Sequence, residues 1–435
     1  MSRRVVITGL GLVSPLGNTA DKLWEGLSNG RSAVRELTSV ATSALPMKFG
    51  AEARDFTGSV EDFGPLDKAT ARTIKKNLKV MCREIQMGTA VAQLAILDAG
   101  LNFEATNLDR FGVLYGSDYM LTLPQEFTAG IRECLDERGG FDFSRWAEQG
   151  LPAVEPLWLL KYLPNLPACH VAIFNELRGP NNSITMREAS ANLAIAEAFC
   201  TIERGHADLM IAGATGTRVH PGRTLHVVLQ EDVATGGGDP AKLMRPFDKN
   251  RSGQVIGEGA GALLLEELSA ARSRGAKILG EVIGFGSSQV VTRKGTGDIK
   301  SAVRNVLIQA LRSAKLTPEK IGHIHAHGLG TQKSDADEAQ AIHEVFGKTQ
   351  TPLTTAKSYF GNLGAGSGLV EAIASLLALQ KGELFSLLNY ETPDPACPIH
   401  AVRNGKSTPA GDNFINLNVT PQGQASAVVI QRYAE

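Results

Sequence analysis

The sequence predicts an α/β fold made of two similar halves, and three observations lead to this prediction. Helix-like segments, such as 85–99 and 299–314, alternate with strand-like segments along the chain. The strand-like segments are continuously apolar, which is typical of a sheet covered by helices on both faces. The pattern also repeats, because VVITGLGLVS near the start resembles GEVIGFGSSQ at 280–289. Two related halves predict one central site between them.

The first half is expected to begin with a strand. Its opening, MSRRVVITGLGLVSPLG, places two arginines before an apolar stretch, as a signal peptide does. Gly9, Gly11 and Pro15 interrupt that stretch, however, and no clear cleavage site follows, so a strand is favoured. A second strand, FGVLYGSDY at 111–119, ends in glycine, and the charged, glycine-rich segment 133–156 is interpreted as an insertion.

The segment NSITMREASANLAIAEAF, residues 182–199, is predicted to be a strand end followed by a buried helix. The helix is apolar on nearly every side, and such helices are buried. Glu188 at its start is costly to bury unless it is paired. It therefore either has a structural role, as a helix cap or a partner of Arg187, Lys357 or His327, or acts as a general acid or base. Adjacent side chains of a helix point in different directions, so Arg187 is expected to pair with a residue other than Glu188.

The second half is expected to repeat this organisation. IGHIHAHGLGT at 321–331 is predicted to be a strand, and TTAKSYFGNLGAGSGLVEAIASLLAL at 354–379 a strand end that enters a helix. The solvated segment 265–277 separates the halves, which gives domains of residues 1–268 and 269–435.

Three histidines share one face of the strand predicted at 321–331. His323, His325 and His327 alternate along it, and alternate residues of a strand point the same way. No cysteine or carboxylate cluster accompanies them, so no metal site is expected. The glycines of GLGLVSPLG do not have the spacing of a dinucleotide-binding motif.

Composition excludes several other classes of protein. The 435 residues carry a formal net charge of −1, which gives no indication of a nucleic-acid partner. No apolar run approaches the roughly 18 residues of a membrane-spanning helix. The cysteines are odd in number and form no C-x-x-C pair, so a reducing cytoplasm is expected rather than a disulfide framework. They are Cys82, Cys134, Cys169, Cys200 and Cys397.

Four stretches occur together in the order and spacing of one family's motifs. They are RGPNNSITMREAS at 178–190, RPFDKNRSGQVIGEGAGALLLEEL at 245–268, HAHGLGTQKSDADE at 325–338 and KSYFGNLGAGSG at 357–368. The chain thereby resembles the β-ketoacyl-acyl-carrier-protein synthases, the type II ketosynthases of fatty-acid and polyketide biosynthesis. The resemblance implies a thiolase-type fold with five layers, α-β-α-β-α. It also implies a dimer and, as partner, an acyl carrier protein whose phosphopantetheine carries the substrate, with no bound cofactor.

The resemblance implies a site from which this chain departs at critical positions. In the family a cysteine at the start of the buried helix takes the acyl group, and two histidines assist malonyl decarboxylation, after which the enolate attacks. Glu188 occupies the cysteine's position, and Asn362 that of the second histidine, while His327 matches the first. All three are expected to converge on one cavity.

The surrounding motif residues are partly retained. Thr331 matches the second threonine of the pantetheine-binding pair, but Leu329 replaces the first. Lys357, Asp335 and Glu338 match the family's supporting charges. NLNVTPQGQAS at 416–426 replaces a flexible Gly-Phe-Gly-Gly loop, and its proline is expected to stiffen the turn.

These departures predict a protein that does not condense through an acyl-cysteine. Glutamate is a poor nucleophile toward a thioester, and Cys200 lies over three helical turns away, roughly 18 Å. One hypothesis is an acyl-binding homologue like a chain-length factor, the cysteine-less partner of a competent ketosynthase, which has glutamine at this position. The alternative is a repurposed thioester enzyme, a malonyl-carrier decarboxylase or hydrolase, in which Glu188, His327 and Asn362 perform acid–base chemistry. A third is a purely structural subunit. A homodimer, or a heterodimer with a cysteine-bearing ketosynthase, is expected.

Overall fold

The main sheet of the computed structural model, which describes residues 3–434, consists of two five-stranded halves with the same pairing pattern. The first half has the order β1-β7-β6-β4-β5 and the second β8-β12-β11-β9-β10, and β1 joins β8 antiparallel. In both halves the first two pairings are antiparallel and the last two are parallel. The strands are β1 (Val5–Val13), β4 (Phe111–Ser117), β5 (Asn181–Thr185), β6 (Leu209–Thr217), β7 (Ile256–Glu267), β8 (Gly280–Gln289), β9 (His323–His325), β10 (Leu353–Thr354), β11 (Asn413–Val419) and β12 (Gln424–Gln431), with the short β2 (Arg35–Glu36) and β3 (Phe49–Ala51) beside β7.

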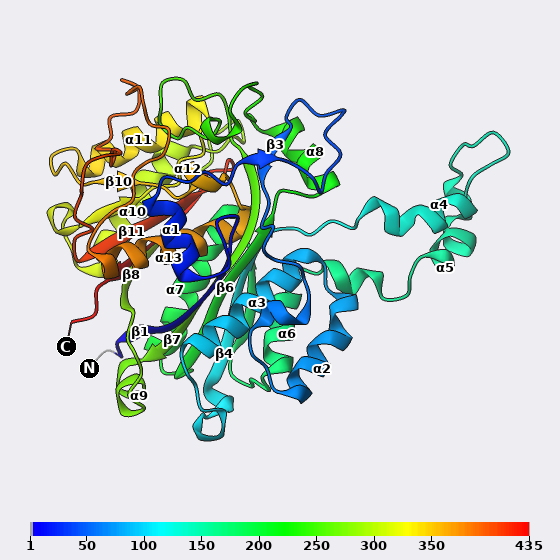
Figure 1. Cartoon of the computed structure of the whole chain (residues 1–435), viewed down its shortest axis with the longest axis horizontal. Coiled ribbons are helices and arrows are strands. Elements are labelled where there is room, and N and C mark those ends of the chain that lie inside the picture. The colour runs from blue at the N-terminus through cyan, green and yellow to red at the C-terminus, as the bar shows by residue number, and fades with distance from the viewer. Residues whose placement is uncertain (1–2, 435) are drawn as a thin grey trace.

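Helices cover both halves and fill the space between them. The helices α7 and α13 contact strands of both halves and form the middle layer, whereas α3 and α6 cover the first half and α10 and α11 the second (Figure 1). The helices are α1 (Ala20–Ser28), α2 (Lys68–Asn77), α3 (Arg83–Asp98), α4 (Thr128–Glu133), α5 (Leu151–Ala153), α6 (Leu166–Phe174), α7 (Ser190–Glu203), α8 (Pro221–Gln230), α9 (Leu268–Ser273), α10 (Ile299–Ala314), α11 (Gln332–Phe346), α12 (Lys357–Phe360) and α13 (Ser367–Lys381).

The predicted α/β fold of two similar halves and five layers is confirmed. The repeated segments are β1 and β8, the paired helices are α3 and α10, and α7 and α13 are buried. Gly116 of β4 allows α7 to begin against the sheet, because an added Cβ would lie 2.8 Å from the backbone of Ser190. The boundary between residues 268 and 269 stays a prediction.

One segment leaves the body of the molecule. Residues 122–162, which we call the arm, contain α4 and α5 and extend outward beyond α6 and α8 (Figure 1). The segment 133–156, interpreted as an insertion, lies within this arm. Among residues 3–434, no helix is both long and apolar enough to cross a membrane.

Candidate functional site

Charged residues follow three neighbouring strands of the first half and meet at one edge of the sheet. The strands β4, β5 and β6 run parallel, so their carboxyl ends share that edge. Asp118 directly follows β4, Arg218 directly follows β6, and Glu188 lies in a short turn between β5 and α7. In the second half, β9 and β10 bring His327 and Asn362 to the corresponding edge.

Glu188 is buried among donors, with only 1% of its surface exposed. Its Oε1 accepts from Nη2 of Arg218, which is equally buried, and from Nδ2 of Asn362 at 3.1 Å. Its Oε2 lies 3.4 Å from Nε of Arg187. The structure therefore brings Glu188 and Asn362 together across the two halves. Arg187, one of the partners considered for Glu188, also faces it, and Arg218 is a partner that was not predicted.

The expectation that Arg187 would serve another partner is correct only in part. Its Nη2 binds Oε1 of Glu231 at 2.5 Å, but its Nε also faces Glu188. The expectation assumed a regular helix, whereas Arg187 has a left-handed backbone with φ of 52°. This conformation, costly for a residue with a Cβ, turns both side chains of the pair inward.

The charges around Glu188 keep it ionised. Burial by itself raises the pKa of Glu188, but Arg187 and Arg218 outweigh burial and hold that pKa well below its usual value. A general base or acid works best with a pKa near the operating pH. The geometry thus supports the structural alternative for Glu188, a buried carboxylate held by partners.

The side chain of Asn362 has a fixed orientation. Its Oδ1 accepts from the backbone N–H of Gly364 at 3.0 Å, which identifies the other end as the amide nitrogen. That nitrogen donates to Glu188 and, at 2.9 Å, to Oε1 of Gln254, so both of its hydrogens are used. Gln254 in turn donates to Glu231 at 2.7 Å.

His327 lies close enough to Glu188 for each charge to influence the other's pKa. Burial, and then the charge of Lys357, lowers the pKa of His327 well below its usual value, so the imidazole is neutral. Glu338 holds the loop in place, because its carboxylate accepts the backbone N–H groups of His327 and Gly328 at 2.6 and 2.9 Å.

The other predicted supporting residues act on the same loop or beside it. Asp335 accepts the backbone N–H groups of Leu329 and Gly330 at 2.9 and 3.0 Å. Lys357 is fully buried and pairs with Glu371. Thr331 is buried, and its hydroxyl has no hydrogen-bond partner among the described residues. The predicted catalytic, supporting and pantetheine-binding roles stay predictions.

The remaining histidines of the β9 face bind a hydroxyl. His323 Nε2 and His325 Nδ1 lie 3.0 and 2.7 Å from Oγ of Ser375, which occupies the space between them. Within residues 3–434, no group of three or more potential ligands has the geometry to hold a metal ion.

Most of the ion network around Glu188 was not predicted from the sequence. Arg218 lies 3.6 Å from Glu231 and 3.9 Å from Asp118. Arg223 extends the network, with contacts of 2.5 Å to Asp118 and 3.0 Å to Glu84. Burial raises the pKa of Glu84 to about 7, although Arg223 opposes this. The placement of a charged residue after each of three parallel strands could have indicated this network.

Two further sequence predictions can be compared with the structure. Pro421 lies in a tight turn between β11 and β12, which is closed by a 3.0 Å bond from the N–H of Gly423 to the carbonyl of Thr420. Cys200 is buried on α7, beyond reach of the position of Glu188, and all five cysteines are free.

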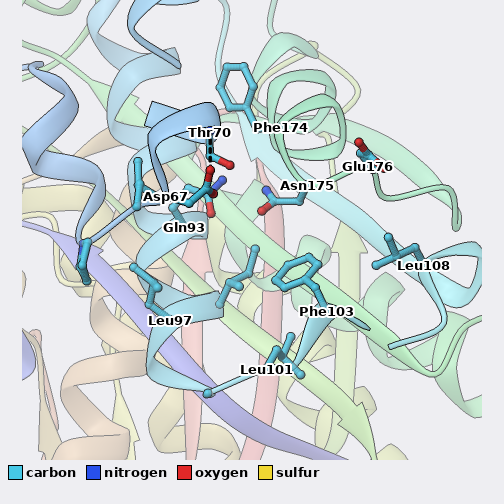
Figure 2. Close-up of a pocket in the computed structure, with 14 residues that line it drawn as sticks. Asp67, Thr70, Gln93, Leu97, Leu101, Phe103, Leu108, Phe174, Asn175 and Glu176 are labelled. Carbon is cyan, nitrogen blue, oxygen red and sulfur yellow. Dashed lines mark hydrogen bonds between the residues drawn. The ribbon is translucent and has the colours of Figure 1, made fainter. Parts of the chain in front are cut away.

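The hollow drawn in Figure 2 lies elsewhere on the molecule. Its volume is about 490 Å³, and it is lined by residues of α2, α3 and α6 and the loops near them, including Gln93, Phe103 and Phe174. None of its lining residues belongs to the Glu188 network. This hollow is therefore separate from the candidate site.

Two family models together match most of the chain. Residues 2–271 match the family model of the β-ketoacyl synthase N-terminal domain, and residues 279–391 that of the C-terminal domain. The chain is 32% identical to 3-oxoacyl-(acyl-carrier-protein) synthase 2 of Synechocystis sp. over 405 residues, which cover 92% of this chain and 91% of that protein.

Solved structures agree with the sequence comparison. A β-ketoacyl synthase from Burkholderia phymatum superposes with a TM-score of 0.84 at 27% identity, covering 99% of this chain and 100% of the other. The ishigamide ketosynthase/chain length factor superposes with a TM-score of 0.84 at 25% identity, covering 100% of both chains.

Proposed function

Because this chain belongs to the β-ketoacyl synthase family, we propose that it binds thioesters of acyl carrier protein but does not condense them through an acyl-cysteine. The proposal includes a role similar to that of a chain-length factor, as one subunit of a dimer. The observation that carries it is the ionised Glu188 at the position of the nucleophile, held by Arg187 and Arg218.

Physical chemistry argues against a covalent role for this carboxylate. An acyl-glutamyl anhydride would hydrolyse readily, and the low pKa of Glu188 makes its carboxylate a weak nucleophile and a weak base. Attack would also require Glu188 to leave two guanidinium groups in a buried setting.

The alternative of a decarboxylase or hydrolase requires a different charge state. An enolate that develops beside an ionised Glu188 is repelled, so decarboxylation needs that carboxyl group to be neutral. Arg187 and Arg218 oppose its protonation. This alternative stays a prediction, and release of carbon dioxide from malonyl carrier protein would reveal it.

Label transfer from a radiolabelled acyl-carrier thioester tests the proposal. We expect no stable label on the denatured protein, with a Cys200→Ala variant as the control for adventitious acylation of a thiol. Stoichiometric label on both proteins would refute the non-condensing function.

Release of carbon dioxide from malonyl carrier protein tests the alternative. Glu188→Gln keeps the shape and removes the titratable group. A reaction that depends on the carboxylate should slow by about 10²-fold or more in this variant. We expect the wild-type rate to remain at the background of the carrier thioester alone.

A basic face on α2 is the surface we propose for the carrier protein. Residues spaced at helical intervals on α2 and just after it are exposed and cationic: Lys68, Arg72, Lys75, Lys76 and Lys79. Such a face would attract an acidic partner, with strong dependence on salt. Lys75→Glu combined with Lys79→Glu should weaken carrier binding, whereas Lys320→Glu, an exposed lysine in the other half, is the matched control.

A further inference from the structure

The hollow drawn in Figure 2 lies at the opposite end of β4 from the Glu188 network. Leu108, which lines the hollow, comes just before β4, whereas Asp118 of the network directly follows the same strand. The volume of about 490 Å³ falls within the roughly 300–1,000 Å³ that is typical of small-molecule sites. A molecule bound in this hollow would therefore be remote from Glu188.

Much of the wall of the hollow is apolar and held in place. Leu97, Leu101 and Phe103 gather on one side of it (Figure 2). The ring of Phe103 packs against Phe111 at the start of β4, with ring centroids 6.5 Å apart. A wall that is already ordered can cover the apolar body of a ligand without paying to fix its own side chains.

Gln93 is a buried polar side chain that lines the same hollow. Only 3% of its surface is exposed, and its Nε2 has no hydrogen-bond partner within residues 3–434. A buried donor that is left unpaired is unfavourable, and a ligand that supplies an acceptor recovers this loss. The last torsion of a glutamine side chain is broad, so a rotation about it can turn this N–H toward the hollow.

Asn175 provides an acceptor opposite this donor. The side chains of Gln93 and Asn175 point toward one another in Figure 2. Nδ2 of Asn175 donates to the carbonyl of Val171 at 2.9 Å, which fixes the side chain and leaves its Oδ1 available. A donor and an acceptor that face the same space complement a carboxamide, because a carboxamide has both a carbonyl oxygen and an N–H.

Charge at the polar end of the hollow disfavours an anionic ligand. Asp67 and Glu176 both line it. Hydrogen bonds from Thr70 hold the pKa of Asp67 below its usual value, so this carboxylate is ionised at neutral pH. Two N–H groups at the start of α2 that could otherwise bind an anion, those of Ala69 and Thr70, already donate to Asp67 at 2.8 and 3.0 Å. A ligand that carries its own carboxylate would be repelled.

We propose that this hollow is a second binding site, which takes a small neutral ligand with an apolar body and one carboxamide group. The carbonyl of the ligand accepts from Gln93, its N–H donates to Asn175, and its apolar body packs against Phe103 and Leu101. This site goes beyond the proposed function, because none of its residues belongs to the Glu188 network.

Two probes of the same shape test whether the site selects a carboxamide. Titration of the intact chain, followed by ligand-observed nuclear magnetic resonance, gives the Kd of hydrocinnamamide and of its carboxylate counterpart, hydrocinnamate. We expect the amide to bind with a Kd of about 1 mM and the carboxylate to bind at least about 10-fold more weakly. Equal affinities would refute the recognition of a carboxamide.

Substitutions in the hollow test where the amide binds. Gln93→Met keeps much of the volume and removes the donor, so it should weaken binding of the amide by about 10-fold. It should leave the stability of the chain unchanged or higher, because it removes an unpaired buried group. Gln309→Met, at an exposed glutamine of α10, is the matched control and should leave binding unchanged. Leu101→Trp fills the hollow and should abolish binding.

Three results would overturn the proposal. If neither probe binds at about 20 mM, or if Leu101→Trp binds the amide as wild type does, the hollow is not a binding site. If Gln93→Met binds the amide within twofold of wild type, Gln93 does not recognise it. If Gln93→Met is clearly less stable than wild type, the amide of Gln93 has a structural role instead. None of these results affects the label-transfer experiment, which tests the proposed function separately.

Discussion

Replacing Arg218 should reveal how the buried carboxylate of Glu188 is tolerated. Arg218→Met keeps much of the side-chain volume but leaves Glu188 without its direct ion-pair partner. Removal of one member of a buried pair typically costs about 3–5 kcal/mol, because the other charge remains in a medium that solvates it poorly.

The remaining contacts of Glu188 set the expected value within that range. Arg187 stays 3.4 Å from the carboxylate, which at an effective dielectric constant of about 20 is an attraction of about 5 kcal/mol. Asn362 also keeps its hydrogen bond. We therefore expect the lower end of the range, about 3 kcal/mol lost from the free energy of unfolding.

A double-mutant cycle separates the free energy of the interaction between Arg218 and Glu188 from the other effects of each substitution. Glu188→Gln alone should cost about 2 kcal/mol, because it leaves Arg218 with only the weaker contacts to Glu231 and Asp118. The double variant should lose no more than about 3 kcal/mol, since neither charge is then stranded, which gives a coupling of at least about 2 kcal/mol.

Equilibrium unfolding in urea, followed by circular dichroism, measures all four proteins. Equal denaturant slopes would show that the unfolded states are comparable. Two outcomes would show that Arg218 does not hold the carboxylate of Glu188. Either the losses of the two single variants sum to that of the double variant within about 0.5 kcal/mol, or Arg218→Met costs less than about 1 kcal/mol.

Three further outcomes follow from the same structure and are measured by urea unfolding. Because the folded-state pKa of Glu188 lies below its unfolded value, its stabilising effect is full above about pH 4.5 and declines at lower pH, so the difference between wild type and Glu188→Gln should shrink there. Burial lowers the pKa of His170 to about 4, so the unfolded state takes up the proton first as the pH falls, and the free energy of unfolding decreases between about pH 6.5 and 4. His170→Phe removes this loss, so the stability of the variant relative to wild type should be about 1 kcal/mol greater at pH 5 than at pH 8. The same difference at both pH values would contradict this. Gly423→Ala should cost about 2 kcal/mol or more, since φ is 79° and the new Cβ would lie 2.3 Å from the carbonyl oxygen of Val290; a neutral result would show that the turn relaxes.

The sequence predicted the fold well because the relevant patterns are local or repeated. The segment 299–314 was expected as a helix and is α10, which begins at its cap Asp298 and ends at the left-handed Lys315. The repeated strand segments became β1 and β8, since continuous apolar runs bounded by glycine specify buried strands. The motif positions likewise predicted that Glu188 and Asn362 would meet.

The ion network was not predicted because it depends on which strands are neighbours. Arg218 lies thirty residues beyond Glu188 and matches no motif that was used. Only the parallel pairing of β4 with both β5 and β6 places Asp118, Glu188 and Arg218 at one edge. The left-handed backbone of Arg187 was equally hidden, because arginine shows no local preference for it.

The two residues predicted to depart from the family's motifs, Asn362 and Glu188, are joined by a hydrogen bond. An asparagine side chain can donate two hydrogen bonds from one nitrogen and accept others at its oxygen, and Asn362 uses all of these capacities: it donates to Glu188 and Gln254 and accepts from Gly364. A neutral imidazole has one donor and one acceptor, so a histidine at this position could not make the same three bonds. The histidine that the resemblance implies at position 362 would therefore not hold the carboxylate of Glu188 as this amide does. A cysteine introduced at position 188 alone would leave Asn362 and both guanidinium groups arranged around the place of a carboxylate, so these residues form a cluster that binds an anion.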